Sequence, residues 1–220
     1  MTEVKICGIT NKEDALFAAE CGAAAVGFIF YPPSPRYIKP TKARKIISVL
    51  PEELVMVGVF VNENAGEIKR VMKYCALDMI QLHGDESPEF CREFPSDRVI
   101  KAVALKNEAD LAYAKSYHVG AILVDSRHAG LYGGTGKKSN WDLACRIRNK
   151  KQLILSGGLN EINVAEALRA VAPAALDINS GVEISPGKKD HAKLTRLFDN
   201  IRAADTAPSN AQLIFSKRKK

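Results

Sequence analysis

Glu3-Val4-Lys5-Ile6-Cys7-Gly8-Ile9-Thr10 is the segment from which the interpretation of this 220-residue chain starts. Its apolar residues are typical of a short buried strand, and Gly8 allows the backbone to turn directly after it. Such a strand delivers Cys7 to its carboxyl end, where parallel α/β folds place their chemistry. Taken alone, the segment favours a structural role for Cys7, as a small buried residue, over a reactive one. The rest of the chain changes that interpretation.

Composition and charge narrow the class of protein. The chain is 46% hydrophobic and 26% charged, which is typical of one globular domain with a sizeable core. The formal charge is +7, but residues 205–220 hold three of those positive charges, so the body carries +4. This mild excess suits an anionic small molecule better than a nucleic acid, because no basic stripe is interleaved with aromatic residues.

The cellular location of the protein and the state of its cysteines can be predicted from patterns that the sequence does not contain. No apolar run approaches the roughly 20 residues of a transmembrane helix, and the N-terminus has no signal-peptide pattern. We therefore expect a soluble, cytoplasmic protein without a membrane partner. The cysteines are odd in number and scattered, which predicts neither a disulfide framework nor a metal site: Cys7, Cys21, Cys75, Cys91 and Cys145.

Short β-branched runs alternate with helical patterns along the chain. The runs recur every 20 to 30 residues, roughly the length of one βα unit, and several are apolar without alternation, as parallel strands covered on both faces are. They predict a single-domain α/β protein, a (β/α)8 TIM barrel. A doubly wound open sheet is disfavoured, since no GxGxxG follows the first run. The predicted strands are Val4–Cys7, Ala25–Phe30, Val55–Val61, Met79–Leu82, Val99–Val103, Ala121–Asp125, Gln152–Leu155 and Ala174–Ile178.

Capping residues mark several helices between these strands. Asn11 and Gly22 bound the first, Ser87-Pro88 opens another that carries Phe90 and Phe94, and Asn160 is expected to cap a third.

The last helix shows i, i+3, i+4, i+7 spacing in Leu194, Leu197, Phe198 and Ile201. The barrel is therefore assigned to residues 1–204. Residues 205–220 form a basic tail, predicted to be disordered, with one short apolar patch at residues 213–215.

Polar residues collect where the predicted strands end, the edge at which barrels carry their active sites. Two glycine-containing turns follow the last two strands, and their exposed N–H groups suit a phosphate dianion. A third glycine-rich segment, residues 133–137, lacks the Walker spacing and is expected to be a mobile flap. The candidate site residues are Cys7, Arg36, Gln81, His83, Asp125, Gly157, Gly158, Asp177, Ser180 and Gly181.

Seven collinear motifs between residues 3 and 203 resemble the phosphoribosylanthranilate isomerases, cofactor-free barrel enzymes of tryptophan biosynthesis. Two positions depart from that family: Ser139-Asn140-Trp141 replaces an aromatic-Asp-Trp run, and Asn179 replaces the first serine of Ser-Ser-Gly. The motifs are Lys5-Ile6-Cys7-Gly8-Ile9-Thr10, Gly27-Phe28-Ile29-Phe30 with Ser34-Pro35-Arg36-Tyr37-Ile38, Val57-Gly58-Val59-Phe60-Val61-Asn62, Gln81-Leu82-His83-Gly84, Gly133-Gly134-Thr135-Gly136, Ser156-Gly157-Gly158-Leu159 and Ser180-Gly181-Val182-Glu183.

The resemblance implies an Amadori rearrangement of N-(5-phosphoribosyl)anthranilate without cofactor or metal. It assigns Asp125 as the acid that opens the furanose ring and Cys7 as the base that removes the C2 proton. The pKa of the acid should then be raised by partial burial, and that of the thiol lowered by cations such as Lys5. Arg36 is expected to bind the anthranilate carboxylate through its guanidinium fork, and His83 to act as a supporting hydrogen bonder.

Two other functions remain open on the sequence. A related isomerase of histidine biosynthesis performs the same rearrangement, but it would have an aspartate in place of Cys7. A barrel that binds a phosphorylated ligand without catalysis is the other. The expected partner is a small phosphorylated aminosugar substrate, and the protein is expected to be a monomer or a homodimer.

Overall fold

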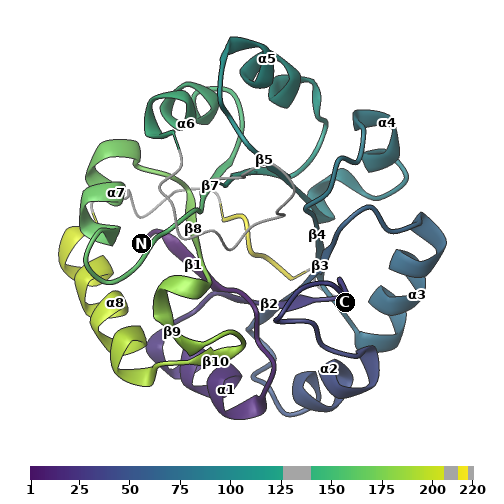
Figure 1. Ribbon diagram of the computed structural model, residues 1–220, viewed down its shortest axis with the longest axis vertical. Coiled ribbons are helices and arrows are strands. Elements are labelled where there is room, and N and C mark those ends of the chain that lie inside the picture. Colours follow the sequence, from purple (N-terminus) through teal and green to yellow (C-terminus); the bar gives the residue numbers. More distant parts are fainter. Residues whose placement is uncertain (126–139, 206–212, 218–220) are drawn as a thin grey trace.

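A computed structural model describes residues 1–125, 140–205 and 213–217. Its strands form a closed parallel barrel in the order β1 to β8, with helices around the outside (Figure 1). The predicted (β/α)8 barrel is therefore confirmed. The strands are β1 (Glu3–Ile6), β2 (Ala25–Ile29), β3 (Val55–Phe60), β4 (Met79–Leu82), β5 (Val99–Val103), β6 (Ala121–Val124), β7 (Leu153–Leu155) and β8 (Ala175–Ile178).

The remaining elements surround the barrel or extend from its rim. A two-stranded antiparallel hairpin, β9 with β10, follows β8 and was not predicted. These elements are α1 (Lys12–Cys21), α2 (Pro40–Ile47), α3 (Ala65–Cys75), α4 (Pro88–Cys91), the 3-10 turn η1 (Ser96–Arg98), α5 (Glu108–Ser116), α6 (Trp141–Arg148), α7 (Val164–Val171), the 3-10 turn η2 (Ser180–Val182), β9 (Glu183–Ser185), β10 (Lys188–Lys189) and α8 (His191–Ala204).

Several strands end one residue earlier than predicted, and this places the candidate residues just beyond them. Cys7 follows β1 and Asp125 follows β6. Each still donates its backbone N–H to the neighbouring strand, Cys7 to the carbonyl of Ile178 at 2.8 Å and Asp125 to that of Val103 at 3.0 Å. The two side chains therefore start from backbone that the barrel holds rigidly.

The predicted helix caps are mostly confirmed. The side chains of Asn11 and Ser87 accept backbone N–H groups at the starts of α1 and α4. Asn160 does not cap α7: its Oδ1 accepts the N–H of Ile162 and of Asn163, so it closes a preceding turn, and the helix begins only at Val164. Helix α4 was predicted to carry both Phe90 and Phe94, but it ends at Cys91 after a single turn, so Phe94 lies beyond it.

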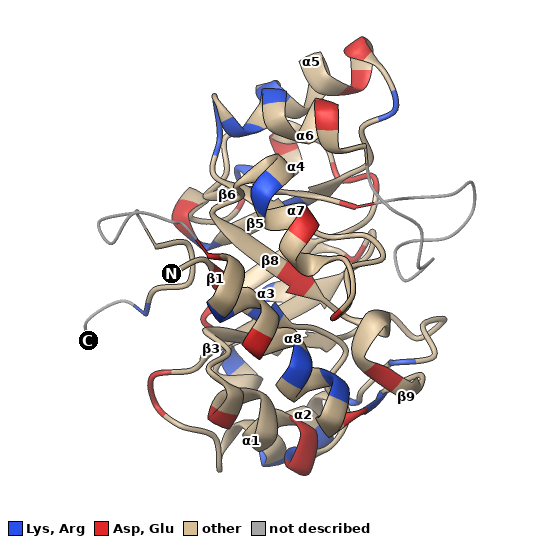
Figure 2. Ribbon diagram, turned by 90° about the vertical axis from the view of Figure 1, so that its left-hand side faces the viewer, with Lys and Arg blue, Asp and Glu red and all other residues tan. Residues whose placement is uncertain are grey.

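Residues 213–217 pack against the end of the barrel opposite the β9–β10 hairpin (Figure 2). Ile214 and Phe215 are 7% and 5% exposed, and their N–H groups donate to the Glu3 carboxylate at 2.6 and 3.2 Å. They fill space next to small residues that begin three strands: Ala25, Ala121 and Ala175. These tail residues thus differ from the expected disorder, because apolar side chains are buried where the barrel interior leaves room.

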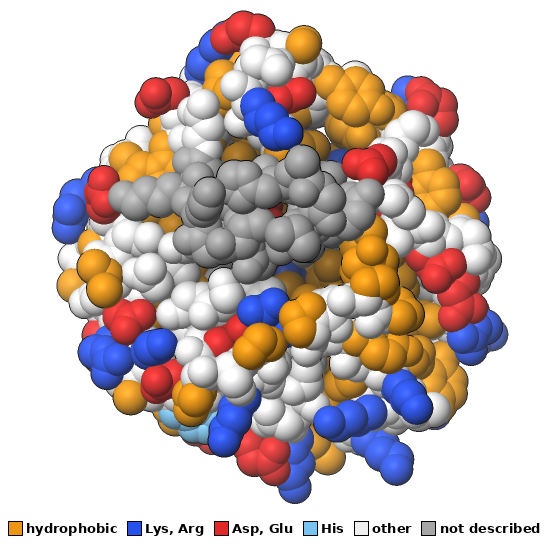
Figure 3. All heavy atoms as spheres, viewed as in Figure 1, with side chains coloured by type: hydrophobic (Ala, Val, Ile, Leu, Met, Phe, Trp, Pro, Cys, Tyr) orange, Lys and Arg blue, Asp and Glu red, His pale blue; other side chains and the backbone are white. Residues whose placement is uncertain are grey.

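The helices around the barrel are short, and their surface carries both positive and negative side chains (Figure 3). The longest helix, α8, has 14 residues, and no helix in the described ranges is long and apolar enough to cross a membrane. On the face shown in Figure 3, Lys and Arg side chains are interspersed with Asp and Glu around the periphery.

Candidate functional site

The interior of the barrel changes from apolar to polar toward the carboxyl ends of the strands. Side chains two apart on a strand share a face. Lys5 on β1 contacts Gln81 on β4, and these strands are not neighbours, so this contact crosses the interior. The buried polar or nucleophilic side chains near this end include Lys5, Cys7, Gln81, His83, Asp125 and Asp177.

Lys5 is fully buried and lies at the centre of this group. Its ammonium donates to Oδ1 of Asp177 at 2.7 Å and to Oε1 of Gln81 at 2.9 Å. A buried ammonium requires such partners, because its desolvation would otherwise be unfavourable. Gln81 and Asp177, predicted to bind substrate, are in this structure the groups that hold Lys5.

Gln81 also determines which nitrogen of His83 carries the proton. Since the Lys5 ammonium can only donate, Oε1 of Gln81 faces Lys5, and the amide Nε2 lies 2.7 Å from Nδ1 of His83. The Nδ1 atom therefore accepts, and a neutral ring carries its proton on Nε2. This Nε2 lies 3.2 Å from Oδ2 of Asp125. The predicted acid is thereby connected to Lys5 through two side chains.

Cys7 lies in a tight pocket beside Ile29 and Val59. A Cβ atom at Gly27 would approach its Sγ to 2.8 Å, so the absence of a side chain there leaves room for the thiol. Burial raises the pKa of the Cys7 thiol, Lys5 and Lys189 lower it, and Asp177 raises it. The sequence-based expectation of a lowered pKa is therefore wrong for this structure, because desolvation outweighs the two cations.

The two glycine turns predicted to bind phosphate lie against one another. Gly157 and Gly158 both have positive φ, +92° and +66°. A Cβ atom on Gly181 would lie 1.9 Å from the carbonyl oxygen of Leu159, so only glycine permits this approach. Among the described residues, the backbone N–H groups of Gly157, Gly158, Ser180 and Gly181 donate to no protein acceptor. Free N–H groups on adjacent turns form a site suited to an oxyanion.

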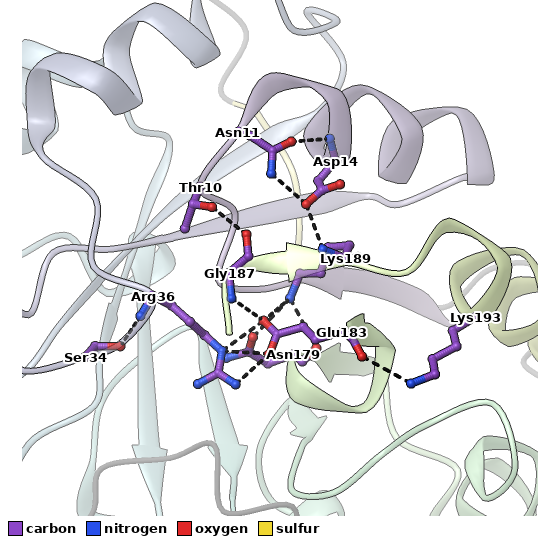
Figure 4. Close-up of polar contacts among 10 residues, drawn as sticks. All are labelled: Thr10, Asn11, Asp14, Ser34, Arg36, Asn179, Glu183, Gly187, Lys189 and Lys193. Atoms are coloured by element: carbon purple, nitrogen blue, oxygen red, sulfur yellow. Dashed lines mark hydrogen bonds and ion pairs between the residues drawn. The ribbon is translucent and has the colours of Figure 1, made fainter. Parts of the chain in front are cut away.

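Arg36 follows β2 and is 9% exposed, but it is already paired (Figure 4). Its Nε donates to Oε1 of Glu183 at 2.9 Å and its Nη2 to Oε2 at 2.6 Å. Glu183 also accepts from the ammonium of Lys189 at 3.0 Å. Any substrate carboxylate would therefore meet a cluster of three charged residues and not an isolated arginine.

The two departures from the expected motifs are accommodated. Asn140 caps α6 through its side chain. Asn179 accepts from the Lys189 ammonium through both its carbonyl and its Oδ1. The expected flap at residues 133–137 lies outside the described residues.

Comparison with known proteins gives the family. The model of the family described as N-(5'phosphoribosyl)anthranilate (PRA) isomerase matches residues 4–200. The N-(5'-phosphoribosyl)anthranilate isomerase of Syntrophus aciditrophicus is 54% identical over 202 residues, which cover 92% of this chain and 88% of that protein. The chain belongs to the phosphoribosylanthranilate isomerase family.

Solved structures of phosphoribosylanthranilate isomerases share the whole barrel. The crystal structure of the enzyme from Thermotoga maritima is 48% identical with a TM-score of 0.83, and covers 92% of this chain and all of that one. A structure in complex with reduced 1-(o-carboxyphenylamino)-1-deoxyribulose 5-phosphate is 45% identical with a TM-score of 0.80, at the same coverage.

Two residues next to the candidate isomerase site were not selected from the sequence. Glu183 is the last residue of Ser180-Gly181-Val182-Glu183, and in the sequence a glutamate after a turn cannot be told from an exposed one. Lys189 lies in Gly187-Lys188-Lys189-Asp190, which is typical of an exposed polar turn. Its burial becomes evident only when β10 folds back on β9 and the backbone N–H of Lys189 donates to Asp14 of α1 at 2.8 Å.

Proposed function

We propose that the chain converts N-(5'-phosphoribosyl)anthranilate to 1-(o-carboxyphenylamino)-1-deoxyribulose 5-phosphate, with Asp125 as general acid and Cys7 as general base. Family membership supports the reaction. One observation supports the residue roles. Cys7 directly follows β1 and Asp125 directly follows β6, and both side chains are buried at the same end of the barrel.

The reaction requires two proton transfers in sequence. Asp125 gives a proton to the furanose ring oxygen while the bond between that oxygen and C1 breaks, leaving an iminium ion. Cys7, as thiolate, then removes the proton on C2. The electron pair of that C–H bond forms the C1–C2 double bond of an enolamine, and the π pair of the C1–N iminium bond moves to nitrogen. Movement of a proton from the C2 hydroxyl to C1 gives the ketone. No atoms are gained or lost, as an isomerisation requires.

The surrounding residues suit these two steps. Lys5 and Lys189 lower the pKa of Cys7 against the effect of burial, and so favour the thiolate that acts as base. His83, with its proton on Nε2, faces Asp125 and can stabilise the carboxylate left after ring opening. Gln81 and Asp177 hold these groups in place and border the space that the sugar would occupy.

The two ends of the substrate would bind at two different sites on the barrel mouth. The phosphate would accept the free N–H groups of Gly157, Gly158, Ser180 and Gly181. The anthranilate carboxylate would bind the guanidinium edge of Arg36 that Glu183 leaves free. Soaking with inorganic phosphate tests the first assignment, since density elsewhere on the barrel would contradict it.

One assay tests the reaction. The anthranilate-bearing substrate is fluorescent, and its consumption by the purified protein should follow saturation kinetics without added cofactor or metal. Absence of turnover with tight binding of the product analogue would favour the non-catalytic binding barrel. Turnover of only the histidine-pathway substrate would favour the related isomerase.

Assembly and location are part of the same proposal. One related structure is described as monomers generated from the dimeric enzyme of Thermotoga maritima. For this chain we propose a monomer or homodimer in the cytoplasm. Light scattering and cell fractionation measure the two properties.

A further inference from the structure

Glu183 occupies only one edge of the Arg36 guanidinium group. Its carboxylate accepts from Nε and from Nη2, which is a side-on, bidentate arrangement. Among the described residues, Nη1 of Arg36 donates no hydrogen bond. The edge formed by Nη1 and the second hydrogen of Nη2 is thus left for an end-on carboxylate (Figure 4).

A neutral Arg36–Glu183 pair would be a poor anion site. The carboxylate of Glu183 is 5% exposed and cancels the arginine charge in a region where water screens little. A second carboxylate approaching the same guanidinium would also be repelled by Glu183. Glu183 therefore fixes Arg36 in position but weakens its attraction for an anion, and another cation must offset this loss.

Lys189 supplies that group. Its side chain is fully buried, and its Nζ lies 3.0 Å from Oε1 of Glu183, 3.2 Å from the Asn179 carbonyl and 3.1 Å from Asn179 Oδ1. All three atoms are acceptors, and only an ammonium has three hydrogens to donate. Burial lowers the pKa of Lys189 and the Glu183 carboxylate raises it, and the three acceptors around Nζ match the three hydrogens of an ammonium, so the geometry corresponds to a charged lysine.

Lys189 is also fixed from the side of the first βα unit. Its backbone N–H donates to Oδ2 of Asp14, whose Oδ1 lies 2.9 Å from Nε2 of His191. The N–H of Gly187 donates to Oε1 of Glu183, and the hydroxyl of Thr10 donates to the carbonyl of Gly187. The hairpin β9–β10 thus holds the lysine rigidly next to Glu183.

We propose that Lys189 is a positioning and specificity-determining residue, which neutralises Glu183 so that the Arg36 cluster keeps one net positive charge for an aryl carboxylate. The proposal deepens the proposed function and rests on its assignment of Arg36. Two cations and one carboxylate give the cluster its single positive charge, and the bound carboxylate completes the neutralisation. Glu183 orients the guanidinium group, while Lys189 preserves its capacity to bind an anion.

The test compares two probes. One is reduced 1-(o-carboxyphenylamino)-1-deoxyribulose 5-phosphate, and the other is the same compound without the ring carboxylate. The ratio of their dissociation constants, measured by titration calorimetry, reports carboxylate selectivity separately from binding of the phosphate and sugar. The variants are Lys189→Met, Glu183→Gln and the double variant, with Arg36→Ala as the reference for loss of the site.

The net charge of the cluster in each variant predicts the order of the selectivity ratios. Lys189→Met leaves the cluster neutral and should lower the selectivity ratio by about 30-fold or more. The double variant regains one positive charge and should recover most of that selectivity. Glu183→Gln should have a ratio no lower than the wild type. This last result remains informative if Lys189→Met does not fold.

Other results would overturn the inference. Equal weakening of both probes in Lys189→Met, or no recovery in the double variant, would leave Lys189 a purely structural role. A ratio in Glu183→Gln far below the wild type would show that charge does not set selectivity. If Arg36→Ala itself keeps the wild-type ratio, the carboxylate site of the proposed function fails, independently of Lys189.

Discussion

The Nζ of Lys5 lies 2.7 Å from Oδ1 of Asp177, and the two side chains are 0% and 5% exposed. The pair lies at the inner face of β1 and β8, next to Cys7. The two charges have opposite effects on the thiol, because Lys5 lowers the pKa of Cys7 and Asp177 raises it.

The first prediction uses this opposition. If Cys7 acts as thiolate, kcat/KM rises with pH through the pKa of Cys7. Lys5→Met should shift this rising limb to higher pH, because a cation that favours the thiolate is lost. Asp177→Asn should shift it to lower pH, because an anion that opposes the thiolate is lost. Shifts in the same direction for both variants would contradict the role of Cys7 as base.

The second prediction concerns Gly27. An alanine there would place its Cβ 2.8 Å from Sγ of Cys7 and 3.1 Å from Cε of Lys5, so the thiol must move. Because small displacements of a catalytic group are costly to rate, kcat should fall by about 100-fold, with a smaller change in KM. Steady-state kinetics measure both.

Gly66→Ala is the matched control. Gly66 lies in α3, and a Cβ there meets nothing closer than 3.4 Å. Alanine in a helix is favoured over glycine by about 1 kcal/mol, so this variant should be fully active and slightly more stable. Full activity of Gly27→Ala would mean that the pocket adjusts and that the thiol position is not critical.

The third prediction concerns the C-terminal segment. Truncation after Asp205 removes the buried Ile214 and Phe215 and exposes the amino end of the barrel. The free energy of unfolding should fall by about 2 kcal/mol, or about 4–8 °C in melting temperature. Activity at 25 °C should be retained, because the segment lies at the end away from Cys7 and Asp125.

Point variants separate this docking from general effects of the tail. Phe215→Ala should reproduce most of the loss, whereas Leu213→Ala, at a residue that is 60% exposed, should not. Equal melting temperatures for the truncated and complete chains, measured by calorimetry, would mean that the segment contributes nothing to stability.

The barrel could be predicted from the sequence because its signals are local. The bounds of β4 and β5 match those predicted, since each apolar run is bordered by residues that favour turns. Cys7 and Asp125 could be selected because a barrel places chemistry at strand ends. The start of α7 could not, because Asn160 and Asn163 are equally good caps in sequence and only the turn geometry separates them.

The electrostatics of the site depend on contacts between distant residues. Lys189 is 153 positions from Arg36 in the sequence, and their shared partner Glu183 belongs to a hairpin that no periodicity indicated. The pKa of Cys7 depends on a balance of burial against two cations, which residue types alone do not fix. The docking of Ile214 depends likewise on space left by small residues at the starts of three strands.

The central claim is that Asp125 opens the ring and Cys7 then breaks the C2–H bond. Both Cys7→Ser and Asp125→Asn should lower kcat by about 10²–10⁴-fold, while the affinity for the product analogue stays within a few-fold. Substrate deuterated at C2 tests the order of events directly. In Cys7→Ser, proton abstraction should become rate-limiting and a primary isotope effect should appear. In Asp125→Asn, ring opening should limit the rate and the effect should be suppressed. The reverse pattern would exchange the two roles, and full activity in either variant would remove that residue from the mechanism.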